Sequence, residues 1–220
     1  MTPWFCSGCG EDQVAFGPIP ADRLCHTCHD TLHPIHAFTE TDAGIPQRYR
    51  GLTRESWIQT FQRPWPEALE SWRGNPQWIA IWGPTGTGKT GLATVLLAEH
   101  LRTGRRGRWI SGPELAHRLR RDFVAAEDVI TPLLTTSLLV LDEPVAGSWD
   151  WYIERLTLIT RTRYEQCLPT IVTSQLLPEL IAPPCVEAPP PLLSRWLSGL
   201  QIATSGDDIR LQETRLQEGR

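Results

Sequence analysis

The sequence predicts an α/β protein built on a parallel β-sheet. Short apolar runs alternate with helical patterns over residues 76–205, as expected where parallel strands are joined by crossover helices. Two of these runs lead directly into distinctive polar segments, a glycine-rich loop at residues 83–90 and an acidic pair at residues 142–143. The 220 residues are enough for one well-packed domain and a small appendage.

Apolar spacing locates the expected elements of this domain. Strands are expected at 77–82, 108–110, 137–141, 170–174 and 200–203. Helices are expected at 89–101, 151–164 and 192–197, and a capping box at Ser111 and Glu114 marks a further helix start. The fully apolar run at 138–141 is typical of a central strand in a parallel sheet.

Composition divides the chain into three segments. Residues 1–40 contain four of the six cysteines and predict a zinc-binding module. Residues 41–75 are polar and interrupted by prolines, which predicts a linker with lead-in helices. Residues 76–220 contain the alternating pattern and are expected to form the main α/β domain.

The loop at residues 83–90 fits the phosphate-binding pattern G-x-x-x-x-G-K-[ST]. Backbone N–H groups and the start of the next helix bind phosphate in such loops. Lys89 is the single lysine among 21 basic residues, and we expect its ammonium to contact the β- and γ-phosphates of ATP. The hydroxyl of Thr90 is expected to bind Mg²⁺. The expected nucleotide-binding residues of the loop are Gly83, Pro84, Thr85, Gly86, Thr87, Gly88, Lys89 and Thr90.

The acidic pair follows the apolar run at 138–141, as in a Walker B motif. Acidic residues at the carboxyl end of a parallel strand face the ligand crevice. Asp142 is therefore expected to bind Mg²⁺, and Glu143 is expected to activate water for hydrolysis. Residues 173–175 lie at the end of the next strand, and one of these polar side chains is a candidate sensor of the γ-phosphate.

The first forty residues carry two Cys-x-x-Cys pairs, formed by Cys6 with Cys9 and by Cys25 with Cys28. Their spacing is typical of four thiolates around one tetrahedral zinc ion. Four histidines, at positions 26, 29, 33 and 36, are alternative ligands, and two redox-active dithiols are a competing interpretation.

Charge and hydropathy limit the environment. The formal net charge of −4 gives no overall attraction to nucleic acid. The sequence has no apolar run of the ~20 residues that a membrane span needs, and the N-terminus lacks the pattern of a secretory signal. We therefore expect a cytoplasmic protein without membrane contact, whose cysteines are reduced.

The motifs together resemble the AAA+ ATPases of the DnaC/DnaI helicase-loader and IstB group. The resemblance rests on the phosphate-binding loop, on Leu-Leu-Val-Leu-Asp-Glu, on Thr-Ile-Val-Thr-Ser, on Leu-Leu-Ser-Arg-Trp at 192–196, and on Tyr-Arg-Gly-Leu-Thr at 49–53 with Trp57. It covers about residues 48–210. It implies an AAA+/ASCE fold of three layers, and the 17 residues after Ala203 leave no room for a C-terminal helical lid.

The resemblance also implies roles for individual residues. Arg195 would be an arginine finger that completes the site of a neighbouring subunit, so the protein would form a homo-oligomer. Gln175 stands where the family usually has asparagine as the γ-phosphate sensor, which implies tuned or slow hydrolysis. The DnaI kind of loader carries an N-terminal zinc module that grips the helicase, and residues 1–40 would do the same here.

The favoured function is therefore ATP-dependent loading of a replicative hexameric helicase onto single-stranded DNA during replication initiation. Three arginines, at positions 118, 120 and 121, are candidates to contact the strand, although a solvated helix face is an equal alternative. Three other functions remain open: an IstB-like transposition helper, a small P-loop kinase, and a zinc-containing adaptor that binds ATP without hydrolysing it. The partner would identify the helper, and Glu143 favours water over a metabolite as phosphate acceptor.

Overall fold

The computed structural model describes residues 2–5, 12–15, 38–70, 72, 78–121, 126–145, 150–175, 190–206 and 208. The chain divides into two compact units, residues 1–38 and 39–220. In the first unit, β1 (Thr2–Phe5) pairs antiparallel with β2 (Asp12–Ala15). The four cysteines of the predicted zinc site lie outside the described residues.

The second unit contains a five-stranded parallel sheet in the order β4-β5-β6-β3-β7. Its strands are β3 (Trp78–Trp82), β4 (Gly107–Ser111), β5 (Leu138–Asp142), β6 (Thr170–Ser174) and β7 (Leu200–Ala203). The prediction of a parallel α/β sheet is thus confirmed, with β6 and β7 at the predicted positions. All five residues of β5 are buried, as its uniformly apolar sequence predicts.

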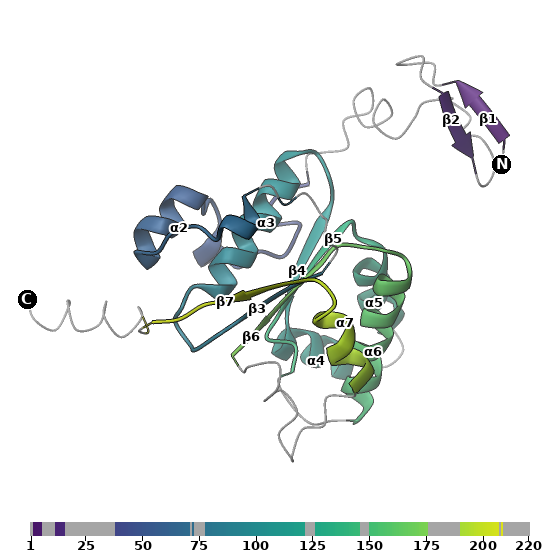
Figure 1. Cartoon of the computed structure of the whole chain (residues 1–220). Coiled ribbons are helices and arrows are strands. Elements are labelled where there is room, and N and C mark those ends of the chain that lie inside the picture. The colour runs from purple at the N-terminus through teal and green to yellow at the C-terminus, as the bar shows by residue number, and fades with distance from the viewer. Residues whose placement is uncertain are drawn as a thin grey trace, which may run out of the picture. The chain divides into compact units, whose positions relative to one another are not determined.

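Helices cover both faces of this sheet (Figure 1). One face carries α3 (Lys89–Arg102), against which α2 (Arg54–Phe61) packs, and the other face carries a layer of four helices. These four are α4 (Gly112–Arg121), α5 (Ala126–Thr135), α6 (Asp150–Glu165) and α7 (Pro190–Trp196). The order helix, sheet, helix gives the three layers that the resemblance implied.

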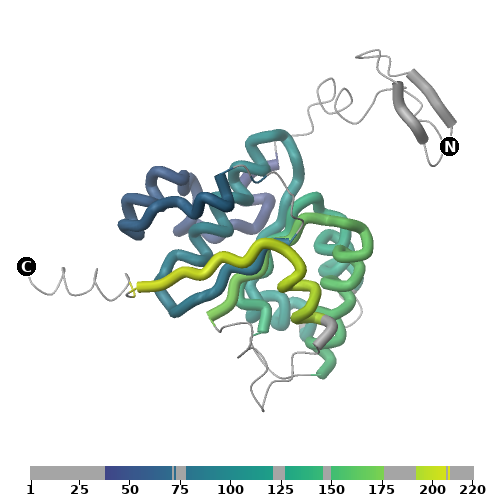
Figure 2. Tube along the Cα trace, in the orientation of Figure 1, coloured from purple at the N-terminus to yellow at the C-terminus, as the bar shows by residue number. Residues whose placement is uncertain are grey.

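Alternating side chains of the strands fill the two interfaces. Leu139 and Leu141 of β5 belong to the core cluster formed with the four-helix layer, where Tyr152 and Trp196 are also buried. Figure 2 shows β7, near the end of the chain, running beside β3, and Ile79 is paired with Leu200 there. The last strand therefore closes the edge of the sheet next to the strand that leads into the glycine-rich loop.

The lead-in segment is anchored to α3 through Arg54. Its guanidinium forms a two-pronged ion pair with Glu99 of α3, in which Nη2 lies 2.6 Å from Oε2. The same guanidinium lies 4.9 Å from the ring centroid of Trp65, which in turn meets Trp57 edge-on at 5.6 Å. The segment also contains two short 3-10 turns, η1 (Gln47–Tyr49) and η2 (Glu67–Leu69). The ion pair ties the first residue of α2 to the last turn of α3.

Helix α5 was not predicted, because Pro132 interrupts its helical pattern. Arg163 of α6 compensates for the irregular backbone that follows. Its fully buried guanidinium donates to the carbonyls of Leu133 and Thr136, both at 2.8 Å, and to that of Pro169 at 2.6 Å. Burial lowers the pKa of Arg163 to about 9, which leaves it charged at neutral pH.

Among the described residues, no helix has the length and apolar character needed to cross a membrane.

Replacing Arg163 by methionine should strongly destabilise the protein. The change removes the guanidinium that donates to three carbonyls, of which that of Pro169 also accepts from the backbone N–H of Leu139. Each buried carbonyl that loses its donor costs ~1–3 kcal/mol. We expect the free energy of unfolding to fall by roughly 3–5 kcal/mol in urea titrations. The control is Arg161→Met on the same helix, whose exposed guanidinium pairs with the exposed carboxylate of Glu165. A similar unfolding midpoint for both variants would contradict the role of Arg163.

Candidate nucleotide-binding site

The glycine-rich loop joins β3 to α3, as the sequence predicted. Three of its glycines have positive φ angles: 145° at Gly83, 74° at Gly86 and 91° at Gly88. Gly88 immediately precedes α3, and a Cβ atom there would lie 2.7 Å from the ring of Phe61. Only glycine therefore fits at this turn, which directs the loop into the amino end of α3.

Internal hydrogen bonds hold the loop in shape. Lys89 is 4% exposed, and its Nζ donates to the carbonyl of Pro84 at 2.7 Å. The hydroxyl of Thr87 donates to the same carbonyl at 2.7 Å and lies 2.6 Å from the hydroxyl of Thr204, just after β7. The side chain of Thr87 thus braces the loop, and the charge of Lys89 is held within it.

The lead-in segment also bonds to the loop. The indole N–H of Trp57 donates to the carbonyl of Gly88 at 3.0 Å, and Arg63 donates to the carbonyl of Thr87 at 2.8 Å. The sequence pattern indicated Trp57 only as part of a lead-in, and it did not indicate Arg63 at all. These two bonds fix the backbone of the loop through its carbonyls.

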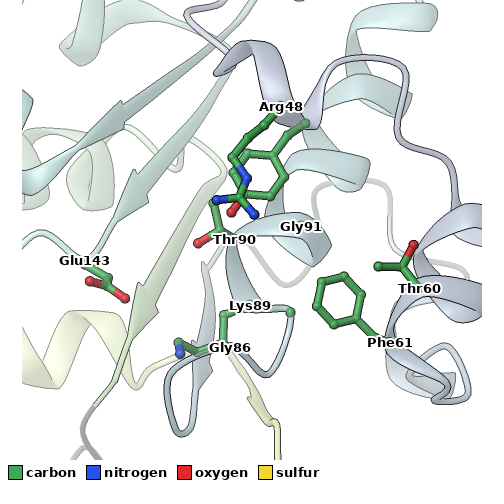
Figure 3. Close-up of a pocket in the computed structure, with 10 residues that line it drawn as sticks. Arg48, Thr60, Phe61, Gly86, Lys89, Thr90, Gly91 and Glu143 are labelled. Carbon is green, nitrogen blue, oxygen red and sulfur yellow. The ribbon is translucent and has the colours of Figure 1, made fainter. Parts of the chain in front are cut away.

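A pocket lies between the lead-in segment and the loop (Figure 3). Figure 3 shows Phe61 and Thr60 on one side of Lys89 and Glu143 on the other. The aromatic rings of Tyr49 and Phe61 suit the flat face of a nucleobase. The lining residues are Arg48, Tyr49, Thr60, Phe61, Gly86, Gly88, Lys89, Thr90, Gly91 and Glu143.

Asp142 ends β5 and is 9% exposed. Its Oδ1 accepts hydrogen bonds from the hydroxyls of Thr90 at 2.9 Å and Thr173 at 2.7 Å. Burial raises the pKa of the Asp142 carboxyl, and these two hydrogen bonds oppose the rise. A carboxylate beside a threonine hydroxyl at the start of α3 is a set of hard oxygen donors, which fits Mg²⁺.

Glu143 is held at both its backbone and its side chain. Its backbone has a φ of 49°, which is uncommon for a residue other than glycine. The backbone N–H donates to the hydroxyl of Thr173 at 3.0 Å, and Oε2 accepts from Nε2 of Gln175 at 2.8 Å. Oε1 of Gln175 accepts from the hydroxyl of Thr85 at 3.1 Å. The structure therefore brings together Thr85, Glu143 and Gln175, which the sequence had assigned to one site.

Thr173 is the site residue whose importance the sequence did not reveal. It was one of three polar candidates at the end of the fourth predicted strand, and Gln175 was the preferred sensor. The structure gives its buried hydroxyl bonds to both acidic residues, as donor to Asp142 and acceptor from Glu143. The signal was its place at the end of a strand that lies next to the Asp142 strand, but this neighbourhood becomes visible only once the strand order is known.

Arg195 lies on α7 and is half-buried. Its guanidinium carbon is 5.7 Å from the ring centroid of Tyr164, a cation–π arrangement. It is not among the described residues that line the pocket of its own chain.

The predicted DNA-contact arginines have different surroundings. Arg118 pairs with Glu114 on the same helix at 2.5 Å. Arg120 is exposed and lies 5.8 Å from the ring centroid of Trp151. The side chain of Arg121 lies outside the part of the chain that the structure describes.

The fold and the loop geometry define the class: a P-loop nucleotide-binding protein whose five-stranded parallel sheet is consistent with the AAA+ fold. Within that class, residues 68–178 match the model of the family described as IstB-like ATP binding protein, and the chain belongs to this family. None of the curated proteins compared with the chain matches its sequence.

Solved structures share the fold. A replication initiator DnaA bound to AMPPCP and single-stranded DNA is 22% identical, with a TM-score of 0.60 over 77% of this chain and 55% of that one. The structure of DnaI is 20% identical (TM-score 0.59; 76% and 94%), and that of the DnaC helicase loader is 18% identical (TM-score 0.58; 73% and 100%). This chain thus spans about half the length of the DnaA structure.

Replacing Thr173 by valine should impair magnesium-dependent turnover of ATP. Valine keeps the shape but removes the hydroxyl that holds both acidic residues, and loss of such a partner typically weakens metal binding or activity 10–100-fold. We expect the Mg²⁺ concentration for half-maximal ATP turnover to rise about tenfold. Thr173→Ser, which keeps the hydroxyl, is the control. Equal magnesium dependence in the valine variant and the wild-type protein would refute this role.

Proposed function

We propose that the protein is an ATPase that loads a replicative hexameric helicase onto single-stranded DNA. The observation that carries the hydrolytic part is the Glu143 carboxylate, which lines the pocket opposite Phe61 and is held by Gln175. Membership of an ATP-binding family supports ATP as the ligand. The fold shared with DnaI and the DnaC helicase loader, together with the two Cys-x-x-Cys pairs, supports helicase loading.

Hydrolysis assigns each side chain a separate task. The loop N–H groups and Lys89 bind the phosphates, and Thr90 with Asp142 holds Mg²⁺, which neutralises phosphate charge when bound. Glu143 takes a proton from water as the water oxygen bonds to the γ-phosphorus and the bond to the bridging oxygen of ADP breaks. Gln175 orients Glu143 and senses the γ-phosphate.

Arg195 supplies the remaining positive charge from a neighbouring subunit. Its position outside the pocket of its own chain supports action in trans, and its contact with Tyr164 restrains the guanidinium. An arginine finger is worth about 10³–10⁵ in turnover. The active form in this proposal is therefore a homo-oligomer.

The amino-terminal segment binds the partner protein in this proposal. Residues 1–40 form a zinc-binding module through Cys6, Cys9, Cys25 and Cys28, residues 41–75 are the lead-in, and residues 76–220 are the ATPase domain. The module contains only one basic residue, Arg23, so it suits a protein partner better than DNA. DNA is then contacted by the ATPase domain, where Arg120 is exposed.

A second candidate function is that of a transposition helper which recruits a transposase. Its support is membership of the IstB-like ATP-binding family over residues 68–178. Both functions use the same ATPase site and differ in the partner. A kinase is disfavoured because the proposed task of Glu143 is to deprotonate water, and an adaptor without turnover would not need Glu143.

Mixing two inactive variants tests catalysis in trans. Arg195→Ala and Glu143→Gln should each lower turnover of ATP by at least about 100-fold. An interface between the two variants can still combine an intact Glu143 with an intact Arg195, so an equimolar mixture should regain about a quarter of wild-type turnover if subunits assemble at random. Inactivity of the mixture, with exchange of subunits verified by fluorescence energy transfer, would contradict the trans role.

Co-purification with the replicative helicase tests the partner. The tagged full-length chain with ATP and Mg²⁺ should retain the helicase, and a chain lacking residues 1–40 should lose it while keeping ATP binding. The quadruple Cys→Ser variant at positions 6, 9, 25 and 28 should behave like the truncated chain and contain no zinc by mass spectrometry. Retention of a transposase in place of the helicase would favour the second candidate function.

A further inference from the structure

We propose that Thr85 of the phosphate-binding loop is a positioning residue, which orients Glu143 through Gln175. The inference deepens the proposed ATPase activity and rests on it. It assigns to the Thr85 side chain a task other than binding phosphate, and it links the loop, through Gln175, to the residue that activates water.

The link is a chain of two hydrogen bonds across three segments. The hydroxyl of Thr85, in the loop after β3, donates to Oε1 of Gln175, just after β6, at 3.1 Å. Nε2 of Gln175 donates to Oε2 of Glu143, just after β5, at 2.8 Å. Gln175 is exposed, so directional contacts such as these restrain its position more than tight packing does.

Glu143 and Thr85 together set which end of the Gln175 amide faces the carboxylate. The carboxylate can only accept, so the amide nitrogen faces it, and the amide oxygen in turn accepts the hydroxyl proton of Thr85. In the opposite orientation, the amide oxygen and the carboxylate would be two acceptors in contact, which is unfavourable. Removing the hydroxyl of Thr85 therefore removes one of the two interactions that fix this orientation.

The backbone of Glu143 makes this orientation effective. Thr173 fixes the N–H of Glu143, and the φ of 49° fixes the direction in which the side chain leaves the backbone. The part of Glu143 that can still move is its side-chain carboxylate, and the hydrogen bond from Gln175 restrains it. A general base must lie within hydrogen-bond reach of the water proton that it accepts, so its restraint affects turnover more than nucleotide affinity.

The length of Gln175 is part of this arrangement. Asparagine, the usual residue of the resembling family at this position, is shorter by one C–C bond of ~1.5 Å. From the same backbone it cannot span both hydrogen bonds, because a shift of that size takes at least one contact beyond bonding distance. The connection between loop and base is therefore a property of glutamine at position 175 of this chain.

The test compares Thr85→Val with Thr85→Ser in steady-state ATP turnover. The valine variant keeps the shape and should lower kcat roughly tenfold, while the Kd for a fluorescent ATP analogue stays within about twofold. Serine keeps the hydroxyl and should restore kcat to within about twofold of the wild-type value. In a Gln175→Ala background, Thr85→Val should have no further effect, because the chain is already broken.

A spectroscopic measurement tests the link independently of turnover. The side-chain amide signals of Gln175, identified by their loss in Gln175→Ala, should shift in Thr85→Val and return in Thr85→Ser. If the wild-type protein binds ATP but shows no turnover, the proposed ATPase activity fails and this measurement still tests the link.

Three outcomes would overturn the inference. They are a Kd that rises as much as kcat falls, effects of Thr85→Val and Gln175→Ala that multiply in the double variant, and Gln175 signals that do not respond to the loss of the Thr85 hydroxyl.

Discussion

The buried carboxylate of Asp142 is the contact on which the site depends. It is almost fully withdrawn from water, and such a charge is stable only with hydrogen-bonding partners. Those partners are Thr90, at the start of α3, and Thr173, near the end of β6. One oxygen atom therefore ties together the helix that follows the phosphate loop and two strands of the sheet. A shift of any of these elements would expose the carboxylate to water or leave it buried without a hydrogen-bonding partner. The site is therefore restricted to one geometry.

Strand order explains why this contact exists. Because β6 lies between β3 and β5, its carboxyl end is adjacent both to the loop after β3 and to the acidic pair after β5. Thr173 points its hydroxyl to the acidic pair, and Gln175 reaches both Glu143 and Thr85. If β3 and β5 were neighbours, no third strand could supply side chains between them. The strand that separates the phosphate loop from the acidic pair, β6, thus also carries the side chain, Gln175, that connects them.

Local sequence patterns predicted the parts of this structure that depend on local chemistry. The glycine-rich loop, the acidic pair and the five strands of the parallel sheet all follow from spacing and apolarity, and β6 and β7 have their predicted bounds. Helix α5 was not predicted because Pro132 is a helix-breaking signal. Its irregular end is stabilised by Arg163, which bonds the carbonyls of Leu133 and Thr136 and lies 30 and 27 residues after them in the sequence. The roles of Thr173, Trp57 and Arg63 likewise depend on contacts between distant segments.

The lead-in segment extends the site beyond the motifs. Trp57 and Arg63 bond carbonyls of the loop, and Phe61 packs where a side chain on Gly88 would stand. None of these contacts requires a phosphate, yet each holds the loop in the shape that directs N–H groups at one. Because a preorganised site does not spend binding energy on ordering itself, residues 53–63 contribute to nucleotide affinity from outside the consensus pattern. The ion pair of Arg54 with Glu99 then makes this contribution depend on α3, the same helix whose first turn carries Lys89 and Thr90.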